Sequence, residues 1–195
     1  MERWVVAAKR ADFAAIGNEF GIDPVIARLI RNRDVQDREE IRRYLHGTVE
    51  ELASPHLMKD VDKAVEILRN KIKEKKRIRI IGDYDIDGVV STFILIKGLK
   101  RVGALADTYI PDRVADGYGI HEHLIERAVN DGIDIIVTCD NGIAAYNEIA
   151  MAKEKGMTVI ITDHHEIPYK ETESGRELIL PSADAIVNPK QPDCN

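Results

Sequence analysis

The chain has 195 residues, of which 28 are Lys or Arg and 34 are Asp or Glu, so its formal net charge is −6. With 44% hydrophobic and 32% charged residues, a chain of this length can bury the core of one full domain and is not disordered. The sequence has no apolar run long enough to span a membrane, and its two cysteines cannot form a disulfide framework. Charges scattered through the apolar run of its N-terminal segment are not typical of a secretory signal. We therefore expect a soluble protein of the reducing cytoplasm, with no membrane partner.

The charge is divided unevenly along the chain. Residues 1–77 hold 17 basic and 14 acidic side chains, whereas residues 78–195 hold 11 basic and 20 acidic ones. An acidic second part does not attract nucleic acid by itself, but it suits a site in which carboxylates hold metal ions. The alternative is an acidic surface that is merely solvated.

Residues 1–76 are expected to form a helical N-terminal region. Apolar residues recur every three or four positions in four stretches, over 11–21, 23–33, 37–47 and 52–77. Asp23 and Pro24 suit the cap and the first turn of the second helix, and Gly47 suits the end of the third. This region therefore precedes a second domain of different character.

Residues 77–195 are expected to form an α/β domain. Five short β-branched runs, at 78–81, 106–110, 134–138, 157–161 and 184–187, alternate with helical stretches that end on glycine. This alternation predicts an open, mainly parallel five-stranded sheet with helices on both faces. The polar segment 169–177 is expected to be a loop.

Three of these strands are followed by residues that can bind metal. Gly82-Asp83-Tyr84-Asp85-Ile86-Asp87-Gly88 follows the first strand, Cys139-Asp140-Asn141-Gly142 the third, and Asp163-His164-His165 the fourth. Ligands of open α/β sheets lie outside the carboxyl ends of the strands. Clustered carboxylates repel one another unless cations separate them, and carboxylates with imidazoles suit Mn²⁺. The set predicts a metal site, and two ions sharing a carboxylate suit attack on phosphate.

Other interpretations remain open for each motif. Asp87 alone is more typical of a helix cap, and paired histidines are often surface residues. The first motif also resembles a calcium loop, but the closing Glu is missing. A flavodoxin-like phosphoacceptor domain also gathers aspartates at strand ends, but it does not need His164 and His165. Cys139 is expected to be a small buried residue without a chemical role.

The segments GDYDIDGVVST, CDNGI and TDHHE resemble the motifs of the DHH phosphoesterase superfamily, which is named for the triplet at 163–165. ARLIRNRDV, YLHGTVEELASPHLMKDVDKAVEIL, IPDRVADGYGI and NPKQPDC make the resemblance closer still to the RecJ branch of exonucleases. The resemblance runs from about residue 20 to the end of the chain. It implies a 5′-to-3′ exonuclease of single-stranded DNA, active in repair and recombination, with a two-metal site for Mn²⁺ or Mg²⁺.

The resemblance also implies roles for individual residues. The metal ligands would be Asp83, Asp85, Asp87, Asp140 and His164, with Asp140 bridging the two ions. Some superfamily members have a histidine ligand where this chain has Ile81, and Asp83 would take its place.

The catalytic residues implied are Asp140, His164 and His165, of which His165 would meet the scissile phosphate. Asp163 would orient its neighbours. We further expect Arg113 to contact DNA phosphate and Tyr118 to support the loop near the metals, with Gly119 beside it. An ordinary glycine-rich turn, with Tyr118 packed locally, is the alternative.

Two other functions keep the same fold. The substrate could be short oligonucleotides or cyclic dinucleotides, or the chain could be a non-catalytic DNA-binding scaffold with a decayed site. Retention of every motif residue argues against decay. The resemblance further implies that a downstream carboxylate and a C-terminal domain of the same protein complete the enzyme, which would leave this piece folded but with little nuclease activity of its own.

Overall fold

A computed structural model describes residues 9–117, 119–173 and 175–194. The chain divides into two compact units, Met1–Ala53 and Ser54–Asn195. The first unit holds three helices, α1 (Phe13–Phe20), α2 (Pro24–Asn32) and α3 (Arg38–His46), and the 3-10 turn η1 (Val49–Glu51). All the metal-binding motifs lie in the second unit.

Each helix of the first unit begins at an aspartate that caps it. Asp12 and Asp23 accept hydrogen bonds from main-chain N–H groups of the first turns of α1 and α2, and Pro24 opens α2. Asp37 and Glu40 form a reciprocal capping box at the start of α3. The predicted helices 11–21, 23–33 and 37–47 are thus present.

The second unit opens with a 3-10 turn, η2 (Pro55–Leu57), and α4 (Val61–Lys73), and then follows a βα alternation. Its main sheet contains β1 (Arg77–Ile81), β2 (Leu105–Tyr109), β3 (Ile135–Cys139), β4 (Thr158–Thr162) and β7 (Ala185–Val187). The strands are parallel, in the order β2-β1-β3-β4-β7. The predicted five-stranded parallel sheet is therefore confirmed, with each strand within one residue of its expected bounds.

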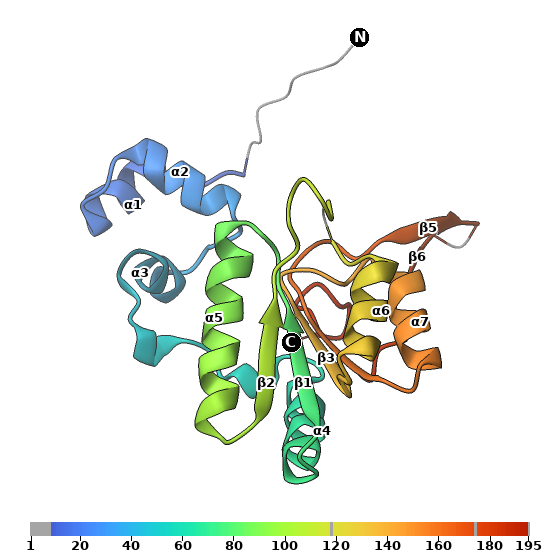
Figure 1. The fold of residues 1–195 in the computed structure, drawn as a ribbon. Helices are drawn as coiled ribbons and strands as arrows, with labels where there is room; N and C mark the ends of the chain where they lie inside the picture. The colour runs from blue at the N-terminus through green and yellow to red at the C-terminus, as the bar shows by residue number, and fades with distance from the viewer. Residues whose placement is uncertain (1–8, 118, 174, 195) are drawn as a thin grey trace. The chain divides into compact units, whose positions relative to one another are not determined.

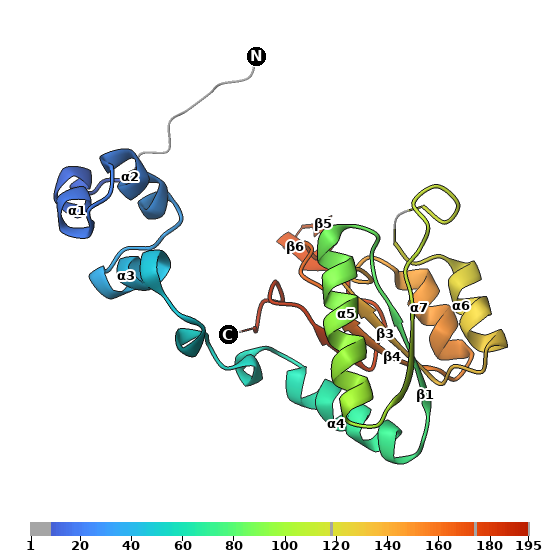
Figure 2. The same ribbon diagram turned by 60° about the vertical axis from the view of Figure 1, so that its left-hand side comes forward.

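Helices cover both faces of this sheet. On one face, α4 and α5 (Ile86–Arg101) pack on the buried residues Ile78, Ile80 and Val137. On the other, α6 (Glu122–Asn130) and α7 (Tyr146–Glu154) pack on Ile81, Ile136 and Ile161. In Figures 1 and 2, α5 (green) lies on one side of the strands and α6 and α7 (yellow to orange) lie together on the other. Alternate residues of each strand thus feed two separate cores.

The segment 169–177 differs from the expected loop. It forms an antiparallel hairpin of β5 (Tyr169–Thr172) and β6 (Gly175–Leu178). Almost all of its side chains are exposed, so the sequence shows no apolar alternation there. The strands are joined by main-chain pairing and by Arg176, which pairs with Glu171 and stacks on Tyr169. The polar composition of this segment therefore predicted a loop where the structure has a short hairpin.

The fourth predicted helix, α4, packs on the sheet and belongs to the second unit. Helix α4 contacts β7, and the Asp60 side chain before it accepts a hydrogen bond of 3.0 Å from Ile186 N. The expected boundary between residues 76 and 77 stays a prediction. Within the described residues, no helix combines the length and the apolar character that crossing a membrane requires.

Candidate metal centre

The three motifs lie side by side because the strands that carry them are neighbours. β3 lies between β1 and β4, with Ile81 opposite Thr138 and Cys139 opposite Thr162. The residues after these strands therefore emerge at one carboxyl edge, the edge at which α/β folds bind ligands.

The first motif forms the turn from β1 into α5. The Asp85 side chain caps this helix by accepting a hydrogen bond of 2.9 Å from Gly88 N. Gly88 lies so close to the chain that a Cβ there would come within 2.5 Å of the Asp83 main chain. This packing leaves Asp83 only 2% exposed. Gly88 thus fixes the carboxylates of Asp83 and Asp85 relative to the helix.

Asp140 has a left-handed main chain, with φ of 60°, which is unusual for a residue other than glycine. Its N–H donates a hydrogen bond of 3.0 Å to Thr162 O, which holds the turn after β3 against β4. The residue is 7% exposed, and its Oδ2 atom is buried without a hydrogen-bond partner among the described residues. A strained main chain and an unsatisfied carboxylate oxygen are together typical of a functional position.

Asp163 organises the two histidines. Its Oδ2 accepts a hydrogen bond of 2.9 Å from Ile143 N, and its Oδ1 accepts one of 2.7 Å from His164 N. The same Oδ1 lies 2.7 Å from His165 Nδ1. His164 Nε2 lies 2.8 Å from Asp140 Oδ1. Both Asp163 oxygens are thus engaged, which leaves metal contact to the neighbouring side chains.

Two sets of ligand atoms come together around Asp140. One set is Asp83, Asp85 and Asp140, and the other is Asp140, His164 and His165. Within each set, one ligand atom from each residue lies within 4.8 Å of those of the other two. Asp140 belongs to both, and one of its carboxylate oxygens is buried without a hydrogen-bond partner within the described chain. Oxygen and imidazole donors at this spacing fit Mn²⁺, and a carboxylate common to two sets fits a pair of ions.

The pKa values of two site residues are shifted by burial and by the neighbouring carboxylates. Burial, followed by the charge of Asp85, raises the pKa of Asp140 above that of an ordinary aspartate. Burial alone would lower the pKa of His165, but the hydrogen bond and charge of Asp163, with the charge of Asp140, raise it. A divalent cation would relieve the repulsion between Asp85 and Asp140.

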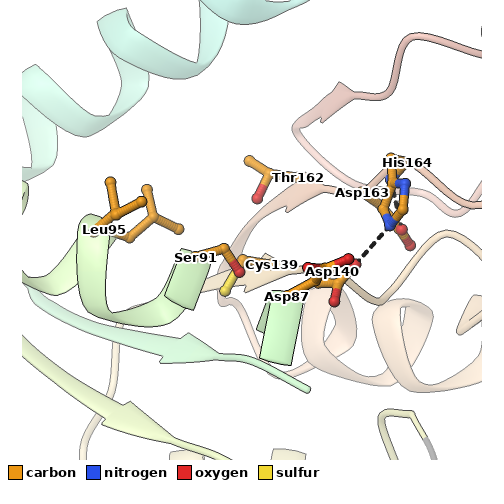
Figure 3. Close-up of a pocket in the computed structure, with 9 residues that line it drawn as sticks. Asp87, Ser91, Leu95, Cys139, Asp140, Thr162, Asp163 and His164 are labelled. Atoms are coloured by element: carbon orange, nitrogen blue, oxygen red, sulfur yellow. Dashed lines mark hydrogen bonds and ion pairs between the residues drawn. The ribbon is translucent and has the colours of Figure 1, made fainter. Parts of the chain in front are cut away.

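Asp87 is the one predicted ligand outside both sets. It is exposed in the first turn of α5 and lines a cavity of about 520 Å³ with Asp140 and His164 at one end. Figure 3 shows Ser91 and Leu95 of the same helix along this cavity, with Cys139 near Asp140. Cys139 is buried, as expected, and its Sγ lies 3.2 Å from Thr92 Oγ1.

Arg113 lies in the segment between β2 and α6, and its guanidinium carbon is 5.5 Å from the centre of the Tyr84 ring. Because Tyr84 stands between Asp83 and Asp85 in the first motif, this contact brings Arg113 next to the predicted ligands. Gly119 lines a second cavity on the same edge. The role expected of Tyr118 concerns a residue outside the described part of the chain.

Two asparagines of the site lie within the quoted motifs but were given no role of their own. Asn141 Nδ2 donates a hydrogen bond of 2.8 Å to Gly82 O and so ties the second motif to the first. Asn188 Nδ2 donates one of 3.0 Å to His165 O. Asn141 lies two residues after β3 and Asn188 directly after β7. The end of a buried strand is the signal that marked the other site residues, but the sequence reasoning followed charged side chains and an amide is uncharged.

Comparisons with known proteins agree with these motifs. Residues 77–195 match the DHH family, N-terminal domain. The single-stranded-DNA-specific exonuclease RecJ of Bacillus subtilis (strain 168) is 38% identical over 193 residues, covering 98% of this chain and 23% of that protein. RecJ of Escherichia coli (strain K12) is 35% identical over 175 residues, covering 89% and 28%.

Solved structures resemble the chain as well. A crystal structure of exonuclease RecJ bound to manganese has a TM-score of 0.63 at 31% identity, covering 74% of this chain and 35% of that one. RecJ from Thermus thermophilus in complex with Mn²⁺ has a TM-score of 0.61 at 25% identity, covering 94% and 24%. The chain spans about a quarter of the length of these curated relatives.

Proposed function

The chain belongs to the DHH family, and from that premise we propose that it carries the metal-dependent phosphodiesterase site of a 5′-to-3′ exonuclease acting on single-stranded DNA. The relatives of similar sequence are single-stranded-DNA-specific exonucleases, and the two similar structures are described with manganese. Repair and recombination in the cytoplasm is the setting proposed for this activity.

One observation carries the proposal, namely that Asp140 is common to both sets of ligand atoms and has a buried oxygen without a partner in the described chain. A merely acidic surface would leave its carboxylates in water, where repulsion costs little. Here the central carboxylate is withdrawn from water and faces Asp85. Such an arrangement is stable when cations occupy it.

Mn²⁺ or Mg²⁺ would be held by Asp83 and Asp85 on one side and by His164 on the other, with Asp140 between. When bound, the ions supply stabilisation of charge on the phosphate and a lowered pKa for the attacking water. Asp163 fixes the ring of His165 through Nδ1. In this proposal His165 would meet the scissile phosphate, and Arg113 adds a positive charge near Tyr84.

Calorimetric titration of the chain with Mn²⁺ tests the metal site. Two ions are expected to bind, and Asp140→Asn is expected to weaken both, because one carboxylate serves the two. Asp116→Asn, which changes a carboxylate whose partners are Asp112 N, Tyr109 and His123, is the matched control. Weakening of only one ion by Asp140→Asn would show that Asp140 does not bridge.

A chimera tests the substrate. In it, this chain replaces the matching stretch of Bacillus subtilis RecJ, so that the remainder of the exonuclease is supplied by the relative. The chimera is expected to degrade a 5′-phosphorylated single strand in Mn²⁺ far faster than dinucleotides or cyclic dinucleotides. A preference for the short substrates would replace the proposed activity with an oligonucleotide hydrolase. Mn²⁺ binding without degradation of any of these substrates would instead identify a scaffold.

A further inference from the structure

A second cavity of about 550 Å³ lies beside His165 on the face of the sheet covered by α6 and α7. Its walls come from three segments, namely residues 119–121 before α6, residues 141–145 between β3 and α7, and residues 163–166 after β4. We call it the α6–α7 cavity. Its volume lies in the range of small-ligand sites.

The α6–α7 cavity combines apolar walls with unsatisfied polar atoms. Ile120 and Ile143 are buried residues that line it. His121 Nε2 and Asn141 Oδ1 are buried atoms of lining residues that have no hydrogen-bond partner within the described chain. Asn141 is 2% exposed, and its amide orientation is fixed because Nδ2 donates to Gly82 O. Its Oδ1 is therefore a buried acceptor beside the cavity without a donor among the described residues.

The charge of the cavity restricts the ligand. Glu148 and Glu166 line it in addition to Asp163. Glu166 is paired with Lys190, but Glu148 brings an acidic group to the first turn of α7. Carboxylates repel a second phosphate, whereas they accept hydrogen bonds from hydroxyl and amino groups. A neutral ring system that carries such donors fits these walls.

The α6–α7 cavity also reaches the proposed catalytic centre, because His165 and Asp163 line it beside the ligand set of Asp140. We propose that it binds the sugar and base of the terminal nucleotide whose phosphate meets His165. The inference rests on the proposed function and names where the nucleoside of the released nucleotide lies. Apolar walls with few polar groups hold any base against the same surface, which suits an enzyme that does not read sequence.

The cavity of Figure 3 is the competing place for that nucleoside. It also reaches Asp140 and His164, but it runs along α5, where Ile94 is 63% exposed. A groove open to that extent suits a continuing strand better than a single terminal nucleoside. The two cavities lie on opposite faces of the sheet, so variants can separate them.

Binding of thymidine 5′-monophosphate and of deoxyribose 5-phosphate to the chain tests the proposal by amide chemical-shift titration, with and without Mn²⁺. The nucleotide is expected to bind about tenfold more tightly than the sugar phosphate and to shift the amides of residues 119–121 and 141–145. Ala144→Phe, at an exposed position lining the cavity, is expected to remove this advantage and to leave Mn²⁺ binding unchanged. Ile94→Phe, the matched change in the other cavity, should retain the advantage.

Equal affinity for thymidine 5′-monophosphate and deoxyribose 5-phosphate would overturn the proposal. So would tighter binding of the nucleotide that persists in Ala144→Phe, or that is lost only in Ile94→Phe. Ala144→Leu, a smaller change, repeats the test if Ala144→Phe lowers the melting temperature. Failure of the proposed function gives a different result, because Mn²⁺ then fails to bind at Asp140 whatever the nucleotide does.

Discussion

The side-chain amide of Asn188 donates a hydrogen bond of 3.0 Å to the main-chain oxygen of His165. Asn188 is 0% exposed at the end of β7, and its Oδ1 accepts a hydrogen bond of 2.8 Å from Lys190 N. The last strand of the sheet therefore holds the loop that presents the second histidine.

Asn188→Leu keeps the size of the side chain but leaves His165 O and Lys190 N without their partner. We expect the free energy of unfolding to fall by about 1–3 kcal/mol and Mn²⁺ affinity to fall with it. Urea denaturation and Mn²⁺ titration measure the two effects. Asn147→Leu, at an exposed position of α7, is the control. Equal effects of the two changes would show that the Asn188 hydrogen bonds contribute nothing.

Asp140→Ala is expected to reduce nuclease activity of the chimera by a factor of at least about 10³, because the ligand common to both ions is lost. The chain itself should still fold, since removal of the carboxylate relieves its repulsion with Asp85. Initial rates on a 5′-phosphorylated strand in saturating Mn²⁺ measure the loss. Asp87→Ala, outside both sets of ligand atoms, should cost less. Activity within about tenfold of the parent chimera would remove Asp140 from the bridging position.

Two glycines of α5 predict opposite responses to alanine. A Cβ at Gly88 would meet the Asp83 main chain, whereas nothing lies within 4 Å of a Cβ at Gly98. We expect Gly88→Ala to unfold at lower denaturant and to lose Mn²⁺ stabilisation, because Asp83 must move. Gly98→Ala should stabilise the chain by about 0.5–1 kcal/mol, since alanine restricts the unfolded chain. Urea midpoints, with and without Mn²⁺, compare the two variants.

Acid should destabilise the fold through Asp134. Its carboxylate accepts hydrogen bonds of 2.8 Å from Arg77 N and 3.0 Å from Lys76 Nζ. The Arg77 hydrogen bond is the main cause that holds the pKa of Asp134 below its ordinary value of 3.8. Because the folded pKa is the lower one, the stabilisation is present above the unfolded pKa and is lost as pH falls through the folded pKa.

The variant Asp134→Asn should therefore be less stable than the parent at neutral pH, and the two stabilities should converge in acid. Urea denaturation over a pH series measures both curves. Glu154→Gln, an exposed change in α7, controls for net charge. A constant difference between the Asp134→Asn and parent curves down to the lowest pH would contradict the linkage.

Arg113 should contribute to DNA binding by charge. Arg113→Ala in the chimera is expected to weaken binding of single-stranded DNA and to reduce the slope of log affinity against log salt by about 0.7, the value for one phosphate contact. Fluorescence anisotropy at several salt concentrations gives the slope. Arg176→Ala is the matched control, because Arg176 also stacks on a tyrosine, Tyr169, but on the β5–β6 hairpin. The same slope in all three proteins would remove Arg113 from the interface.

The sequence predicted the sheet and its three motif loops because buried strands and strand-end carboxylates are local patterns. It did not predict the β5–β6 hairpin, whose exposed side chains leave no alternation of burial. The helical repeat of α4 shows which of its faces is apolar but not that the helix packs against β7.

Within the site, the sequence marked charged residues and passed over amides. Asp85 and Asp87 have the same residue type and similar neighbours in sequence, but only Asp85 lies in a set of ligand atoms. The direction in which α5 leaves the sheet separates them, and that direction depends on the packing of Gly88 against Asp83. Such packing is a tertiary property, so the motif alone could not rank the two aspartates.

The strand order makes the site depend on the pairing of the inner strands of the sheet. The motifs follow β1, β3 and β4, which are the three inner strands, while β2 and β7 form the edges. Opening of β2 leaves all three motif strands paired, whereas separation of β3 from either neighbour divides them. Bound Mn²⁺ should therefore slow amide hydrogen exchange in the inner strands far more than in β2. The metal would thus hold together the middle of the sheet, where β1 pairs with β3 across the longest sequence separation between paired strands of that sheet.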